Sequence, residues 1–178
     1  MSRLAIPASI DGTPSGSHAA LHAVAKSLGS VPNLFRLVAH SPAALQGYLG
    51  IGAALRGAEL DGRTQTRIAL AVAESNGCAY CLAAHAWLGR HVAKLDDAEI
   101  AANRGGHSND PRADAAVTFA STLVRSRGHV TDAALAAVRA QGWSDAAIVE
   151  IVLTVALNTF TNYVNEVART EICLLYTS

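Results

Sequence analysis

The chain contains few aromatic residues, few cysteines and no excess of charge of either sign. Phe, Trp and Tyr make up only 5% of its 178 residues, so the core must consist mainly of aliphatic residues and alanine. Fourteen basic side chains balance fourteen acidic side chains. A neutral chain has no electrostatic attraction for nucleic acid or for an anionic membrane surface, so we expect neither as a partner.

Long apolar runs and targeting signals are also missing. No segment approaches the roughly 18 consecutive apolar residues of a membrane span. The start of the chain, residues 1–7, has no long apolar stretch after its single charge, which a secretory signal would require. We therefore expect a cytoplasmic protein. Thiols are kept reduced in that compartment, so two closely spaced cysteines are more often catalytic or metal-binding than structural.

No strand-like alternation competes with the helical spacing of the apolar residues. Short polar residues that favour helix starts precede several of the apolar segments, namely Ser41, Asp61, Asp110 and Ser144. The sequence predicts one compact all-α domain of about eight to ten helices over residues 17–172, following an irregular leader over residues 1–16.

The last six residues, 173–178, fit poorly after the polar end of the last expected helix. Their sequence, CLLYTS, resembles the translation of a common sequencing adapter. We expect a non-native tail here and exclude Cys173 from the chemistry. The alternative is a genuine apolar tail that docks on a partner subunit.

The reactive side chains are concentrated in residues 74–85, whose sequence is ESNGCAYCLAAH. Cys78 and Cys81 stand three positions apart, and His85 follows Cys81 by four positions. Asn76 and Gly77 predict the end of one helix, so the cysteines would lie in the first turn of the next. Thiols at a helix N-terminus have a lowered pKa, because the helix dipole stabilises the thiolate.

On a helix, residues with these spacings share one face, which brings His85 one turn beyond Cys81. The pattern therefore favours a redox dithiol in which His85 accepts the proton of Cys81. Cys81 would then attack an oxidant, and Cys78 would close the disulfide. Two alternatives remain open. The three side chains could be ligands of a zinc ion, although no second CxxC completes that site, or the cysteines could be buried structural residues. We expect no metal and no cofactor.

Other residues near the motif have both a functional and a structural interpretation. Glu74 lies one helical turn before the first cysteine and is a candidate for a proton relay or for a solvated helix position. Tyr80 is a candidate for the same relay or for packing. Asn158 and Asn162, in an apolar helix, are expected to bond buried backbone at the helix junction. Trp87 is expected in the core or in a subunit contact.

The motif and its flanks resemble the alkylhydroperoxidase D-like branch of the carboxymuconolactone decarboxylase superfamily. The matching segments lie between about residue 30 and residue 172 and comprise residues 31–36, 76–85, 156–163 and 170–172. The resemblance implies an all-helical subunit that assembles into trimers or hexamers. It also implies reduction of a small hydroperoxide at the dithiol, with re-reduction by an external dithiol such as a lipoyl or thioredoxin-like protein.

By the pattern of this family, Cys81 is the peroxidatic cysteine, Cys78 resolves the intermediate and His85 relays protons, joined by Tyr80 in some members. One position departs from the pattern. The family's relay glutamate stands twelve residues before the first cysteine, where this chain has Thr66. Either Glu74 or Thr66 with a water replaces that glutamate, or the proton relay is weaker than in the family.

We therefore expect a hydroperoxide reductase. The rival functions are dithiol–disulfide exchange, a redox-sensing or metal-binding module, and a decarboxylase-like activity. The decarboxylase branch generally lacks the dithiol.

Overall fold

A computed structural model of the chain describes residues 2–172, in which every regular element is helical. A 3-10 turn at Ser15–Ser17 is followed by nine α-helices: α1 (His18–Leu28), α2 (Asn33–Val38), α3 (Pro42–Arg56), α4 (Gly62–Ser75), α5 (Ala79–His91), α6 (Asp97–Arg104), α7 (Pro111–Ser126), α8 (Asp132–Ala140) and α9 (Asp145–Ala168). The predicted all-α fold is thus confirmed for this part of the chain. The expected non-native tail, with Cys173, lies outside the described residues.

The predicted helix starts are confirmed by their capping hydrogen bonds. Asp61 and Asp110 each accept the backbone N–H three residues later at 2.9 Å, and Ser41 and Ser144 do the same at 3.2 and 3.1 Å. Such caps satisfy N–H groups that have no partner within the helix. Local polar residues therefore fix where these helices begin.

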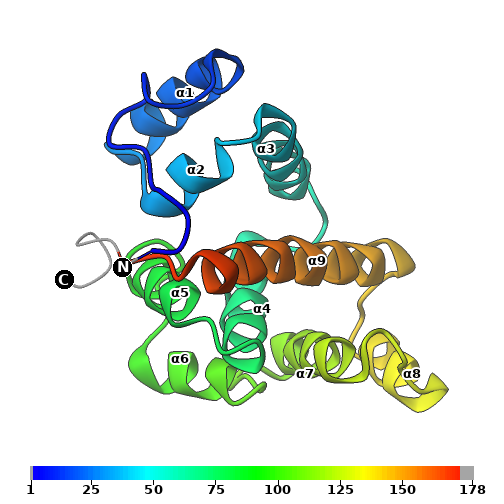
Figure 1. Ribbon diagram of the computed structural model, residues 1–178. Coiled ribbons are helices and arrows are strands. Elements are labelled where there is room, and N and C mark those ends of the chain that lie inside the picture. Colours follow the sequence, from blue (N-terminus) through cyan, green and yellow to red (C-terminus); the bar gives the residue numbers. More distant parts are fainter. Residues whose placement is uncertain (1, 173–178) are drawn as a thin grey trace.

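Helix α9 crosses the molecule, with α1, α2 and α3 on one side of it and α5 to α8 on the other (Figure 1). Helix α4 is the main packing partner, because it contacts α5, α6, α7 and α9. One apolar core lies between α4, α7, α8 and α9 and includes Ile68, Phe119 and Ile151. A second core joins α1, α2 and α3 to the start of α5 and contains both motif cysteines.

Helix α9 is the only helix within residues 2–172 that is long and apolar enough to cross a membrane, with a mean hydropathy of 1.4. Its buried face carries three asparagines, Asn158, Asn162 and Asn165, which are at most 7% exposed. Because this face packs against α4, α5 and α7, the helix has the character of a core helix. Its opposite face leaves apolar side chains exposed, among them Val149, Tyr163 and Val167.

A buried ion pair joins α4 to α6. The Nε of Arg67 donates to Glu99 at 2.7 Å, and both side chains are 7% exposed. Burial acts to raise the pKa of Glu99. Hydrogen bonds from the side chains of Ser108 and Asn103, the Asn109 backbone and Arg67 outweigh it and lower the pKa to about 2. This network also holds the loop between α6 and α7.

The leader, residues 2–14, contains no helix and lies against α2 and the end of α9. The backbone N–H of Arg3 donates to the carbonyl of Ala168 at 2.6 Å. Arg36 of α2 donates to the carbonyl of Pro7 at 3.1 Å. The leader therefore links two helices that border the second core.

Candidate active site

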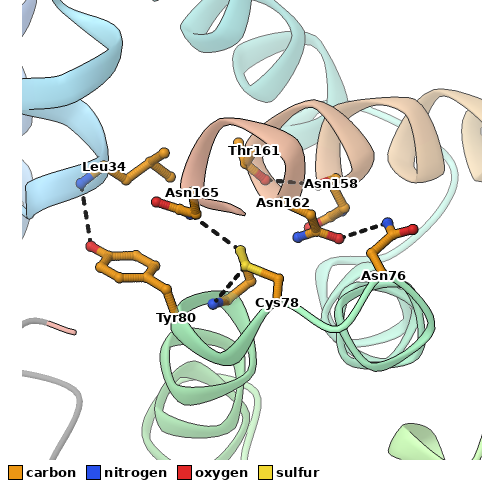
Figure 2. Close-up of a disulfide and its surroundings, with 9 residues drawn as sticks. Leu34, Asn76, Cys78, Tyr80, Asn158, Thr161, Asn162 and Asn165 are labelled. Carbon is orange, nitrogen blue, oxygen red and sulfur yellow. Dashed lines mark hydrogen bonds between the residues drawn. A yellow bond between two sulfur atoms is a disulfide. The ribbon is translucent and has the colours of Figure 1, made fainter. Parts of the chain in front are cut away.

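The turn between α4 and α5 places the cysteines. Gly77 has a φ of 68°, a left-handed conformation that glycine adopts without a steric penalty. The N–H of Cys78 then reaches back to the carbonyl of Ala73 at 3.0 Å. The Asn76 side chain donates to the Oδ1 of Asn162 at 2.9 Å, which attaches the turn to α9 (Figure 2). The predicted helix junction before the dithiol is confirmed.

Cys78 and Cys81 are joined in a disulfide, with their Cα atoms 5.3 Å apart. Cys78 is the N-cap of α5, and its Sγ accepts the backbone N–H of Cys81 at 3.3 Å. Cys81 is the third helical residue, and its Sγ accepts a hydrogen bond from Nδ2 of Asn165 at 3.2 Å (Figure 2). Both cysteines are buried, at 0% and 3% exposure. Their sulfurs therefore lie at the N-terminal end of a helix, where a thiolate is stabilised.

A cavity of about 560 Å³ lies beside the dithiol, walled by residues of α1 to α5 and α9. Cys81 and His85 line it, whereas Cys78 does not. Most of its walls are apolar, and its polar groups are neutral amides, hydroxyls and the imidazole of His85. No Asp, Glu, Lys or Arg lines the cavity among the described residues. Trp87, expected in the core or in a subunit contact, also lies in the cavity wall.

His85 is a neutral imidazole near pH 7. Burial of the ring lowers its pKa from 6.5 to about 4, although a hydrogen bond with the Asn158 side chain acts in the opposite direction. The ring is half-buried in the cavity wall one turn beyond Cys81. A neutral imidazole at this position can accept a proton from a group in the cavity.

Tyr80 is buried, and its ring packs in the same apolar core as the two cysteines. Its hydroxyl points toward the start of α2, where it accepts the backbone N–H of Leu34 at 3.3 Å (Figure 2). The side chain also lines the cavity. Tyr80 thus connects α2 to the cysteine turn, and its hydroxyl is directed away from the disulfide.

Glu74 is not brought to the dithiol and has the surroundings of a solvated helix position, the second of its two expected roles. Its carboxylate accepts a hydrogen bond from Arg104 of α6 at 2.6 Å, with both side chains about half exposed. Thr66, at the position of the family's relay glutamate, does line the cavity. Its hydroxyl donates a hydrogen bond to the backbone carbonyl of Gly62, in the same helix, at 2.9 Å. Thr66 therefore lies at the cavity, and its part in a proton relay stays a prediction.

The asparagines of α9 contribute more to the site than the sequence indicated. Asn158, expected to bond backbone, donates to the carbonyl of Thr154 at 2.8 Å and also bonds His85. Asn162 bonds a side chain at the junction, that of Asn76. Asn165 was missed. Its spacing from the other two places it on the same helix face, and this pattern in an apolar helix was the available signal.

No arrangement for a metal ion is formed by the described part of the chain, within which no group of three or more His, Cys, Asp or Glu side chains is gathered. In the disulfide form, neither sulfur is a thiolate that could bind zinc.

One family model matches the part of the chain that holds the dithiol. Residues 42–122, which include the dithiol, match the model of the carboxymuconolactone decarboxylase family. No curated protein has a matching sequence.

Three solved structures illustrate the likeness in fold. An alkylhydroperoxidase AhpD core, an uncharacterized peroxidase-related protein from Ralstonia eutropha, has a TM-score of 0.87 and 22% identity, covering 98% of this chain and 94% of that one. A peroxidase-related protein from Silicibacter sp. TM1040 has a TM-score of 0.83 and 22% identity, covering 98% and 93%. The debrominase Bmp8, as a variant in complex with 2,3,4-tribromopyrrole, has a TM-score of 0.82 and 17% identity, covering 99% and 96%.

At these identities the structures establish the fold, and the family model adds the sequence evidence around the dithiol. Residues 42–122 therefore resemble the carboxymuconolactone decarboxylase family in sequence, and the chain has the fold of the alkylhydroperoxidase AhpD core.

Proposed function

We propose that this protein reduces an uncharged organic hydroperoxide at the Cys78–Cys81 dithiol and that an external dithiol re-reduces the resulting disulfide. One observation carries the proposal, namely the asymmetry of the pair. Cys81 lines the cavity together with His85, whereas Cys78 lies behind it as the cap of α5. A substrate in the cavity therefore meets one sulfur first.

In the first step, the thiolate of Cys81 attacks the terminal oxygen of the hydroperoxide, and the O–O bond breaks. The sulfur becomes a sulfenic acid and the alkoxide leaves as an alcohol after taking a proton. His85 accepts the thiol proton of Cys81 and gives it to the leaving oxygen. A thiolate nearby raises the pKa of an imidazole, so the reduced pair favours this transfer more than the disulfide form does.

In the second step, the thiolate of Cys78 attacks the sulfenic sulfur of Cys81, and the oxygen leaves as water. The Cα separation of 5.3 Å suits this closure, because it lies within the range of ordinary disulfides. An external dithiol then transfers two electrons and two protons to the pair and becomes a disulfide itself. Lipoyl and thioredoxin-like proteins are the reductants that this chemistry would accept.

The cavity indicates the class of hydroperoxide. Its volume of about 560 Å³ falls in the usual range of small-molecule sites. Hydrogen peroxide would leave most of this space unused, and a substrate with a carboxylate would find no cation in the walls. An alkyl or aryl hydroperoxide without charge fits both features.

The proposal is tested by hydroperoxide consumption with dithiothreitol as the reductant. Cumene hydroperoxide should show a higher kcat/KM than hydrogen peroxide. Cys81→Ser should fall to the background rate, and Cys78→Ser should accumulate a sulfenic acid that dimedone traps. If both variants turn over like the parent, the dithiol is not the site. A decarboxylase-like activity would then have to be tested instead.

Two rival dithiol reactions are separated by the same samples. The first rival is dithiol–disulfide exchange with a protein or lipoyl partner, without peroxide. Rapid exchange without any trapped sulfenate would favour this rival. The likeness to the debrominase makes reductive dehalogenation the second candidate, since a neutral apolar cavity also suits a small halogenated ring. In that reaction the dithiol supplies two electrons, a proton replaces the halogen and halide is released. Bromide release from a bromopyrrole measures it directly.

We also propose that a second copy of the chain covers the exposed face of α9. The apolar residues on this face recur every three or four positions, as in paired helices: Val149, Leu153, Ala156, Phe160, Tyr163 and Val167. A trimer or hexamer, which the family resemblance implies, would bury them. Light scattering measures the mass, and Tyr163→Asp should shift it toward the 18.4 kDa of one chain. A parent protein that is already monomeric would contradict this.

A further inference from the structure

Asn165 is the side chain of α9 that touches the dithiol. The residue is 1% exposed, and its Nδ2 donates to the Sγ of Cys81 at 3.2 Å. Its Oδ1 is buried and has no hydrogen-bond partner in the described range 2–172. A disulfide sulfur only accepts hydrogen bonds, so the nitrogen, not the oxygen, of the amide belongs toward the sulfur. One half of this amide is thus bonded and the other half is not.

Reduction of the disulfide changes what the two sulfurs offer to this amide. A thiol brings an S–H that can donate to the unpaired Oδ1 of Asn165. A thiolate at Cys81 accepts from Nδ2 more strongly than a disulfide sulfur does, because the acceptor is charged. Buried polar atoms without a partner are unfavourable, and charge-assisted hydrogen bonds are stronger than neutral ones, so either change, in the thiol or in the thiolate state of Cys81, stabilises the reduced form relative to the oxidised form.

We propose that Asn165 is a positioning residue that shifts the equilibrium of the Cys78–Cys81 pair toward the dithiol, making its disulfide easier to reduce. The inference rests on the proposed function, in which the pair is oxidised and re-reduced in each cycle. An external dithiol donates two electrons and two protons, the S–S bond breaks, and both cysteines end as thiols while the donor becomes a disulfide. Asn165 favours the products of this step.

The test is the redox midpoint of the pair in buffers of reduced and oxidised dithiothreitol, measured by alkylation of the free thiols. Asn165→Leu keeps a similar branched shape, with a larger volume, but removes both amide groups. The loss of one hydrogen bond to sulfur should shift the equilibrium constant about tenfold toward the disulfide. That shift corresponds to a midpoint about 30 mV more negative. Asn165→Ala, which cannot overfill the site, should shift it in the same direction.

Asn103→Leu is the matched control. Asn103 is also fully buried, donates through Nδ2 and has an unpaired Oδ1 among the described residues, but it lies beside Glu99. Its replacement should lower the unfolding temperature and leave the midpoint unchanged.

The inference would be overturned if the equilibrium constants of Asn165→Leu and Asn165→Ala lay within twofold of that of the parent. A shift equal to that of Asn103→Leu would do the same, because it would trace to general loosening. The measurement uses no peroxide, so it separates the two claims. A shifted midpoint in a protein without peroxidase activity would overturn the proposed function alone.

Discussion

The surroundings of Glu99 and of Cys81 are both buried, yet they differ in charge and in how they are hydrogen-bonded. Both oxygens of the Glu99 carboxylate accept hydrogen bonds, including those from Arg67 and the Asn109 backbone. The Cys81 sulfur is contacted by a neutral amide, that of Asn165. A charged group with every partner in place resists change. A sulfur among neutral amides can gain and lose a proton or a bond, as a redox site requires.

Removing the charge of Glu99 should produce the largest effect on stability. Glu99→Gln leaves the buried guanidinium of Arg67 without a counter-charge, which should lower the free energy of unfolding by about 3–5 kcal/mol. Urea unfolding of the isolated protein measures this. The double variant Arg67→Met/Glu99→Met, which removes both charges, should recover part of the loss. If the single variant is as stable as the parent, the ion pair does not hold the scaffold together.

Removing the imidazole of His85 should affect the rate rather than the fold. His85→Gln keeps a polar side chain of similar size but cannot relay a proton, so kcat/KM for an organic hydroperoxide should fall about 100-fold or more. Stopped-flow oxidation of the reduced enzyme measures the step. If His85→Gln lost as much stability as Glu99→Gln and kept the parent rate, His85 would belong to the scaffold and not to the reactive site.

Acid should affect the two regions in different pH windows. The pKa of His85 falls from 6.5 to about 4 on folding, so the unfolded chain binds the proton better between these values. Its contribution to stability is therefore complete above about pH 6.5 and is lost as the pH falls toward 4. The pKa of Glu99 falls from 4.5 to about 2, so its contribution is lost below about pH 4.5.

The stability of the protein against pH measures both windows. In His85→Gln, the free energy of unfolding should change less between pH 6.5 and 4 than in the parent, and its loss below about pH 4.5 should be unchanged. A curve of His85→Gln that runs parallel to that of the parent between pH 6.5 and 4 would show that His85 does not titrate on unfolding.

The smallest effect is expected at Glu74. Its ion pair with Arg104 is about half exposed, and surface pairs contribute between about 0 and 1 kcal/mol. Glu74→Gln should therefore leave both the unfolding free energy and the peroxidase rate nearly unchanged. Thr66→Val, in the cavity wall, is the informative comparison. A large loss of peroxidase rate in Glu74→Gln would instead show that Glu74 belongs to the proton relay.

Local spacing was sufficient to predict that the side chains of the motif lie close together. Cys78, Cys81 and His85 belong to one helix and its cap, so their neighbourhood follows from the helical period alone. Glu74 was misplaced by the same argument, because the left-handed turn at Gly77 separates its helix from that of the cysteines. Residues one turn apart in sequence do not share a face across such a break.

Asn165 could not be found by local reasoning. It stands 84 positions from Cys81, and only the packing of α9 on α5 brings the two together. The fold class was predictable because helix caps and apolar spacing agree along the whole chain. The hydroperoxide, the reductant, the assembly and the cytoplasmic location depend on other molecules or on the cell, and they stay predictions.

The position of Cys78 at the start of α5 gives one side chain two separate duties. Its sulfur takes part in the disulfide and also accepts the Cys81 N–H, as a capping serine oxygen would. A Cys78→Ala variant would therefore lose chemistry and a helix cap together, the second worth about 1 kcal/mol. Cys78→Ser separates the two, since its hydroxyl can cap the helix but cannot form a disulfide. Any survey of substitutions at this position will rank serine as mild for folding and severe for turnover.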